Sequence, residues 1–155
     1  MKKVVIIDYK LSNLYNVKHA LEHYNINPVI SSNKNDIYNA DGIILPGVGA
    51  FGDAMNNLKK YDLIEPIKDF LSTGKPFMGI CLGFQLLFSE SEEFGSHKGL
   101  DIIKGVVKKF PHKINNKKVK VPQIGWNTIF KPNEYITWAN SPLKELKEKE
   151  YMYFV

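Results

Sequence analysis

Short apolar runs and longer amphipathic stretches alternate along the first part of this chain. Uninterrupted apolar runs of four or five residues are typical of parallel strands buried on both faces, while apolar positions three and four apart indicate helices. Together these patterns predict a doubly wound, three-layer α/β fold with a mostly parallel, flavodoxin-like sheet. The expected strands are 4–7, 29–30, 42–46 and 77–80, and the expected helices are 14–24, 36–40, 53–60, 62–72 and a last one carrying Phe84, Leu87 and Phe88.

The pattern changes after Phe94. Runs at 102–103, 105–107 and 119–121 are short and β-like, and they predict a small antiparallel extension beside the main sheet. Ser141 and Pro142 are expected to begin a helix, and residues 151–155 form a last apolar run with the character of a strand. With 155 residues, the chain is long enough for one domain with a substantial core, and we expect a single domain over residues 1–155.

The net charge of +5 raises the question of a nucleic-acid partner. Every basic residue is lysine, so the bidentate guanidinium fork that suits phosphate and guanine is absent from the chain. The lysines are scattered, which indicates a solvated surface, and we expect neither a nucleic-acid partner nor a membrane partner. A single cysteine is typical of a reducing compartment, so we expect a cytoplasmic protein.

That cysteine, Cys81, lies between Gly79 and Gly83 at a predicted junction of strand and helix. This is the arrangement of a nucleophile elbow with sulfur in place of the serine oxygen, and its turn is too sharp for side chains on both sides. The following helix offers free N–H groups to a developing oxyanion. The alternative is a buried core thiol, since free cysteine is among the most buried residue types. The glycines and the flanking elements favour the nucleophile.

A second glycine-rich segment, 47–52, follows the strand 42–46. Three glycines between a strand and a helix make a loop rich in available N–H groups, which could contribute to an oxyanion hole or bind an anion. An ordinary turn is the alternative reading. No Gly-Lys-Ser/Thr sequence follows, so the segment is not a Walker loop.

A cysteine nucleophile needs a general base, which is usually histidine. His19 and His23 are four residues apart on the first helix and are expected to be surface residues, since the further ligands of a metal site are missing. His97 and His112 do not follow a parallel strand beside Cys81. Either His97 folds back as the base, or the base lies outside this chain. We expect no metal and no cofactor.

Three motifs resemble the class I glutamine amidotransferases. Within that class they resemble the HisH family, the glutaminase subunit of imidazole glycerol phosphate synthase. The motifs are Pro46–Met55, Gly79–Phe88 and Pro122–Asn127, and the resemblance extends from Val4 to Val155. It implies hydrolysis of L-glutamine to glutamate and ammonia. The ammonia would pass to a HisF-type (β/α)8-barrel cyclase subunit for histidine biosynthesis.

The resemblance also implies roles for individual residues. Cys81 would be the nucleophile, and the backbone N–H groups of Leu82 and Gly49 would form the oxyanion hole. The positions implied for substrate binding are Gly47, Val48, Gly49, Gln85 and Glu93. The positions implied for the interface with the cyclase subunit are Asn13, Trp126, Asn127 and Tyr153. Read without the resemblance, Trp126 is expected to be a core residue, and a partner contact is the alternative.

Three departures from the family pattern stand out. Family members carry a His-x-Glu pair after the strand that corresponds to residues 153–155, and neither residue of that pair is present here. We therefore expect a C-terminally truncated chain that is inactive without the pair. Gln123 stands where the family usually has histidine. The segment 8–14 lacks the glycines that the family favours there.

These departures leave other functions open. A HisH-like paralogue could supply ammonia to a sugar amidotransferase for surface glycans. A non-catalytic subunit could use the Trp126 surface to bind a barrel partner. A protease-like thiol hydrolase on the same sheet is disfavoured by the motif at 46–55.

Overall fold

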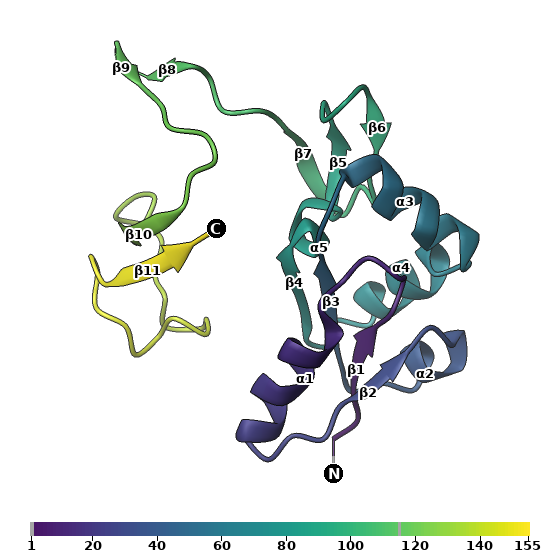
Figure 1. Ribbon diagram of the computed structural model, residues 1–155. Coiled ribbons are helices and arrows are strands. Elements are labelled where there is room, and N and C mark those ends of the chain that lie inside the picture. Colours follow the sequence, from purple (N-terminus) through teal and green to yellow (C-terminus); the bar gives the residue numbers. More distant parts are fainter. Residues whose placement is uncertain (1, 115) are drawn as a thin grey trace. The chain divides into compact units, whose positions relative to one another are not determined.

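Four parallel strands form the main sheet in the computed structural model of this chain (Figure 1). The strands are ordered β2-β1-β3-β4, so the chain moves to one edge and then returns past β1 to the other. This reversal is the topology of a doubly wound sheet and confirms the predicted fold class. The strands are β1 Val4–Ile7, β2 Val29–Ser31, β3 Gly42–Gly47 and β4 Phe77–Cys81.

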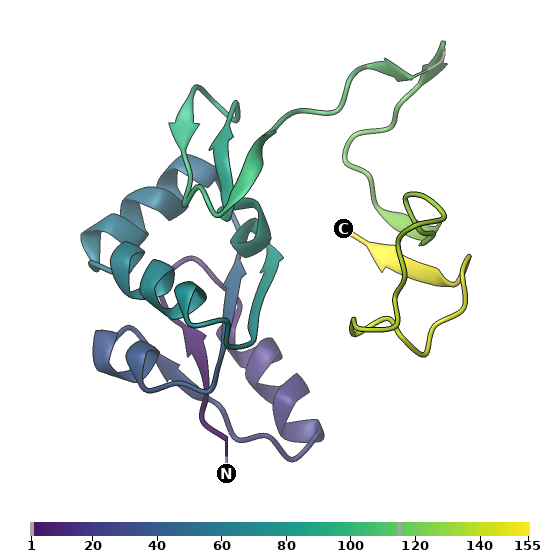
Figure 2. The same ribbon diagram turned by 180° about the vertical axis from the view of Figure 1, so that it is seen from behind.

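Helices cover both faces of this sheet. The connection from β1 to β2 runs toward one edge of the sheet, and the later connections run toward the other edge. Crossovers between parallel strands are right-handed, so α1 lies on one face of the sheet and α2, α3 and α4 lie on the other (Figures 1 and 2). A short helix, α5, follows β4 directly. The helices are α1 Leu14–His23, α2 Lys34–Tyr38, α3 Phe51–Lys60, α4 Ile64–Ser72 and α5 Leu82–Gln85.

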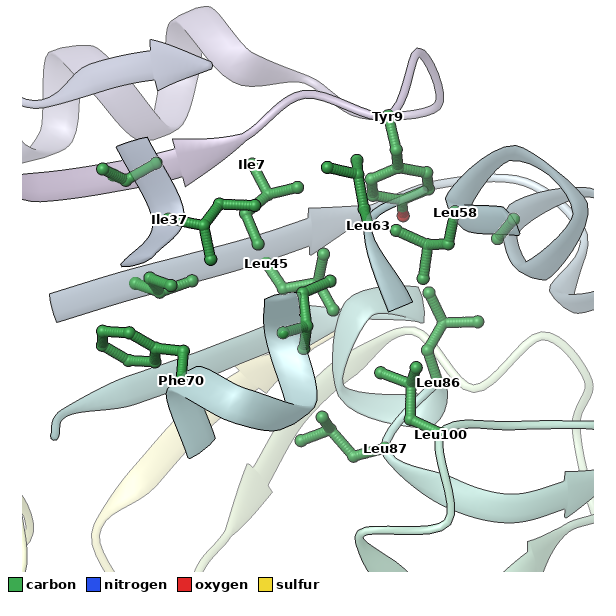
Figure 3. Packing of buried hydrophobic residues seen from close by; sticks show 14 of the residues in the cluster. Ile7, Tyr9, Ile37, Leu45, Leu58, Leu63, Phe70, Leu86, Leu87 and Leu100 are labelled. Carbon is green, nitrogen blue, oxygen red and sulfur yellow. The ribbon is translucent and has the colours of Figure 1, made fainter. Parts of the chain in front are cut away.

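The main core lies between the sheet and α2, α3 and α4. Ile7 and Leu45 point from the strands toward apolar side chains of those three helices, and Figure 3 shows Ile37, Leu58 and Phe70 among them. Helix α1 has no fully buried residue. The carboxyl ends of β1, β3 and β4 consequently meet at one edge of a well-packed layer, where ligands of doubly wound sheets bind.

A second, three-stranded sheet follows α5, in the order β6-β5-β7. Strand β5 pairs antiparallel with β6 and parallel with β7, so the expected antiparallel extension is a mixed sheet. Its strands are β5 Phe88–Ser91, β6 His97–Lys98 and β7 Ile103–Val107.

The helix expected to reach Phe88 ends at Gln85 instead. The amide of Leu100 donates to the carbonyl of Leu86 at 2.8 Å, and the amide of Ile102 donates to the carbonyl of Leu87 at 2.9 Å. In a longer helix, these carbonyls would instead accept hydrogen bonds from amides four residues further along the chain. Phe88 therefore begins β5, and its helical spacing from Phe84 was misleading.

The structure describes residues 2–114 and 116–155, and they form two compact units that divide between Lys109 and Phe110. The second unit holds short antiparallel pairs, and none of its described side chains is fully buried. The prediction of a single domain stays a prediction. The strands of this unit are β8 Lys113–Ile114, β9 Lys117–Lys118, β10 Gly125–Thr128 and β11 Tyr151–Phe154.

Two expectations for the second unit are wrong. Residues 119–121 form no strand, and the helix expected after Ser141 is a series of turns with bonds such as Lys144 N–H to the Ser141 carbonyl at 3.1 Å. A short helix depends on burial of its apolar face, and Leu146 remains 39% exposed. The final strand is present as β11. None of the helices in the described part of the chain is long and apolar enough to span a membrane.

Candidate active site

Cys81 lies at the junction of β4 and α5, as the sequence pattern predicts. Its backbone has φ +53° and ψ −118°, a conformation that residues with a side chain rarely adopt. The residue is exposed. A strained turn that presents a thiol to solvent at the carboxyl end of a strand fits a nucleophile elbow and not a core cysteine.

The two glycines beside Cys81 are required by close packing. A Cβ on Gly83 would overlap the carbonyl of Leu45 on β3, and a Cβ on Gly79 would lie 2.7 Å from the Cα of Phe84. The first turn of α5 can therefore press against β3 only because Gly83 has no side chain. This contact sets the position of the Leu82 amide beside Cys81.

The glycine-rich segment lies next to the elbow. Gly47 is opposite Cys81 in the parallel register of β3 and β4, about 4.8 Å away in a typical sheet. Gly49 has φ +95°, which favours glycine, and a Cβ there would meet no atom within 4 Å. The amide of Val48 donates to the carbonyl of Leu11 at 3.0 Å. The Val48 amide therefore has a hydrogen-bond partner within the protein.

A buried tyrosine lies beneath this pair of segments. Tyr9 follows β1 and has no exposed surface, and its hydroxyl has no hydrogen-bond partner among the described residues. The hydroxyl occupies the space beside Gly47 that a side chain there would need. Burial, with a smaller contribution from the Cys81 thiolate, raises the pKa of the Tyr9 phenol well above its usual range. The phenol next to Cys81 is therefore neutral.

A cavity of about 510 Å³ adjoins α5 on the side of the mixed sheet. Gln85 and Glu93 line it, together with Glu92, Phe94, Val107, Lys108 and Lys109. Lys108 pairs with Glu92 at 3.1 Å. Glu93 accepts a hydrogen bond from the Phe51 amide at 2.7 Å through Oε2. The lining of the cavity thus combines acidic and basic side chains.

The histidines take no part in a hydrogen bond with Cys81 in the part of the chain that the structure describes. The His97 ring packs over Gly52, where a Cβ would lie 2.7 Å from the ring. Nδ1 of His19 lies 3.0 Å from Glu22 on the surface of α1. His97 is therefore placed against the start of α3, and its folding back as a base gains no support.

The residues proposed for a partner interface belong to both units. Asn13 is the exposed N-cap of α1 in the first unit. Trp126 and Tyr153 are cross-strand neighbours on β10 and β11 in the second unit, with their rings 5.5 Å apart. Trp126 is 68% exposed, so it is not a core residue within this chain. Asn127 follows on the other face of β10 and is half-buried.

Two features of the site were missed by the reading of the sequence. The sequence predicted neither a role for Tyr9 nor the contact between Glu93 and the start of α3. Tyr9 directly follows an apolar strand, and that position at the sheet edge was an available signal. The bond between Glu93 and Phe51 joins residues 42 positions apart, and no local pattern indicates it.

Comparison with known proteins shows the family and the fold. The family model described as "Glutamine amidotransferase class-I" matches residues 5–150. A crystal structure of a glutamine amidotransferase superposes with a TM-score of 0.58 at 18% identity, covering 67% of this chain and 55% of that one. At that identity the likeness shows the fold alone.

Named relatives are more similar in sequence. "Imidazole glycerol phosphate synthase subunit HisH 1" of Legionella pneumophila (strain Paris) is 42% identical over 156 residues, which cover 100% of this chain and 73% of the relative. The HisH subunit of Methanosarcina mazei is 47% identical over 155 residues, covering 100% of this chain and 71% of the relative. The chain belongs to the class I glutamine amidotransferases and, within them, to the HisH family of imidazole glycerol phosphate synthase subunits.

Proposed function

We propose that this subunit hydrolyses L-glutamine at Cys81 and that the ammonia is used by a HisF-type cyclase subunit in histidine biosynthesis, in the cytoplasm. The observation that carries the proposal is the elbow conformation of Cys81 directly opposite Gly47 of the glycine-rich segment. A nucleophile and a source of amide donors lie side by side there, as acyl transfer requires.

The thiolate of Cys81 adds to the carbon of the glutamine side-chain amide. The oxyanion that forms accepts hydrogen bonds from the amides of Leu82 and Gly49. Collapse of this intermediate breaks the C–N bond and releases ammonia, which takes up one proton, and leaves a thioester on Cys81. Water then hydrolyses the thioester to glutamate and restores the thiol. The resemblance assigns these proton transfers to a His-x-Glu pair that is not among the 155 residues.

The cavity beside α5 is the proposed site for the amino-acid part of glutamine. Gln85 is one helical turn from Cys81, and Glu93 carries the negative charge that an α-ammonium group prefers. Gly47, Val48 and Gly49 would line the path of the side-chain amide toward the thiol. The volume is within the range of small-molecule sites in proteins.

The partner surface is proposed to include Asn13, Trp126, Asn127 and Tyr153. Exposed tryptophan and tyrosine side chains that pack against one another are typical of protein interfaces. The partner expected on this surface is a (β/α)8-barrel cyclase.

The test is a glutaminase assay of the full gene product in complex with the cyclase subunit. Cys81→Ser keeps the size of the side chain, and it should lower kcat by about 10⁴-fold or more. A glutamine-like electrophile should label the Cys81 peptide in the unsubstituted protein and leave the variant unlabelled. Ser32→Ala, an exposed change outside the site, is the control.

Retained turnover in Cys81→Ser would overturn the catalytic proposal. Tight binding of the cyclase without labelling of Cys81 would indicate a binding subunit. Ammonia release that responds to a sugar amidotransferase and not to the cyclase would assign the chain to the glycan paralogues.

A further inference from the structure

One stretch of the chain carries positive charge without any counter-charge in its sequence. No carboxylate side chain lies between Asp101 and Glu134, and the same stretch holds eight lysines. The whole chain has a net charge of +5, so the remaining residues together have a net charge of −3. Lysines occur throughout the sequence, whereas acidic residues are absent from this part of it. The excess of positive charge is therefore confined to one stretch.

Two of these lysines have carboxylate partners in the first unit. Lys104 pairs with Asp101 at 2.6 Å, and Lys108 pairs with Glu92 at 3.1 Å. In the second unit, by contrast, three exposed lysines have no carboxylate partner among the side chains that the structure describes. These three are Lys113, Lys118 and Lys120. The uncompensated charge is thus presented to solvent by the second unit.

Residues 113–120, which we call the lysine hairpin, also place like charges opposite one another. Strand β8 pairs antiparallel with β9, and Lys113 lies directly across from Lys118 (Figure 1). Like charges at facing positions destabilise an antiparallel pair, and an isolated two-stranded hairpin is only marginally stable in water. An acidic surface bound to the lysine hairpin would remove this repulsion.

The lysine hairpin is continuous along the chain with the aromatic pair of the proposed partner surface. Lys120 is six residues before Trp126, which corresponds to at most about 20 Å of extended chain. Val121 and Ile124 lie between them and are 51% and 49% exposed. An apolar centre with a polar rim is typical of interfaces between proteins. The lysine hairpin has the position and the charge of such a rim.

We propose that the lysine hairpin binds an acidic surface of the barrel cyclase and accelerates its association with this subunit, beside the contact at Trp126. This inference deepens the proposed function, since it rests on that partner. Complementary charges at the rim of an interface act mainly on the association rate. Lysine supplies charge without the bidentate fork with which arginine recognises phosphate and guanine, so an acidic protein surface is favoured over a nucleic acid.

The test measures the association and dissociation rates of the full gene product with the cyclase subunit at about 50 mM and about 500 mM salt. Lys113→Gln combined with Lys118→Gln removes two charges from the lysine hairpin and leaves side chains of similar length. In low salt, we expect association to become about threefold to tenfold slower and dissociation to stay within about twofold of the parent. In high salt, the association rates of parent and variant should converge, because the charges are screened.

Lys144→Gln combined with Lys147→Gln is the matched control. It removes the same number of charges from exposed positions of the same unit, and Lys144 already has a partner in Glu145 at 3.7 Å. The control should associate within about twofold of the parent rate. Because both double variants have the same net charge, a difference between their rates reports where the charges lie. Thermal melts should show that neither double variant loses stability.

Equal association rates for the two double variants would overturn the proposal, and so would association of the parent that does not depend on salt. A mixed-sequence RNA oligonucleotide is the competing probe. If RNA binds the parent but not the hairpin variant, while association with the cyclase is unchanged, the lysines serve a nucleic acid and the proposal is wrong. If the parent does not bind the cyclase at all, the proposed function fails together with this inference. If it binds and the hairpin variant associates at the parent rate, only this inference fails.

Discussion

The hydroxyl of Tyr9 fills the space that a side chain on Gly47 would occupy, directly below the segment that faces Cys81. The contact joins the end of β1 to the end of β3. The size of residue 47 and the position of the phenol therefore depend on one another. A change at either residue should alter the packing beneath Cys81.

Gly47→Ala should destabilise the protein by about 1–3 kcal/mol, because the added methyl group overpacks a closed site. The new Cβ would meet the Tyr9 hydroxyl and would also lie 2.8 Å from the backbone nitrogen of Gly83. Adding Tyr9→Phe should therefore restore only part of the loss. Urea denaturation of the single and double variants measures both effects.

Gly42→Ala is the matched control on the same strand. A Cβ there would be 3.6 Å from the nearest atom, the Pro76 carbonyl oxygen, which is an ordinary contact. Gly42→Ala should lower the free energy of unfolding by less than Gly47→Ala does. Equal losses of stability would mean that glycine in β3 matters for reasons other than the contact with Tyr9.

Tyr9→Phe alone should leave stability near neutral pH unchanged or raise it by about 1 kcal/mol, because it removes a buried hydroxyl without a partner. The parent protein should also lose stability in alkali. Its phenol has a pKa above the ordinary value in the folded state, so the unfolded chain loses the proton first as the pH rises past about 10.

The stability difference between the parent and Tyr9→Phe should therefore shift in favour of the variant by up to about 1.4 kcal/mol per pH unit above that value. Urea midpoints at pH 9 and pH 11 measure the shift. Tyr15→Phe, at a side chain that is 71% exposed, is the control. An identical pH response in both variants would contradict the assignment to Tyr9.

Asp36→Asn should reduce the sensitivity of the fold to acid. Hydrogen bonds from Lys3 and Ser31 hold the pKa of the Asp36 carboxyl below its usual value. The stability from these bonds is present at neutral pH and is lost as the pH falls through the ordinary carboxylate range and below. The variant should be less stable than the parent at pH 7, and the gap should narrow toward pH 3.

Thermal melts between pH 7 and pH 3 measure the difference in stability between the parent and Asp36→Asn. Glu90→Gln, at an exposed carboxylate on β5, should show no such convergence with the parent. A constant gap for Asp36→Asn would mean that its bonds contribute the same amount with a protonated carboxyl.

Trp126→Ala should weaken binding of the proposed cyclase partner by about 2 kcal/mol or more, as expected for an aromatic residue at the centre of an interface. It should hardly change the stability of this chain, because the side chain is 68% exposed. Calorimetric titration with the cyclase and thermal melts separate the two effects. Tyr135→Ala, at 85% exposure in the same unit, is the control. Equal affinity in both variants would place the interface elsewhere.

The sequence by itself determined the local elements of the site. Apolar runs located the four parallel strands, and the two glycines around Cys81 located the elbow, because both features depend on residues close together in the chain. The glycine-rich segment after β3 was found in the same way. Local patterns were misleading where partners were distant, as with the helix that ends at Gln85 and the turns after Ser141.

Only the tertiary structure decided how these elements support one another. The Tyr9 hydroxyl reaches Gly47 across the ends of two strands, and Glu93 reaches Phe51 across 42 residues. Such contacts depend on sheet order and on the turn between β5 and β6, and neither leaves a periodic signal in the sequence. The exposure of Trp126 was likewise decided by the fold, since an aromatic residue on a strand suits a core and an interface equally well.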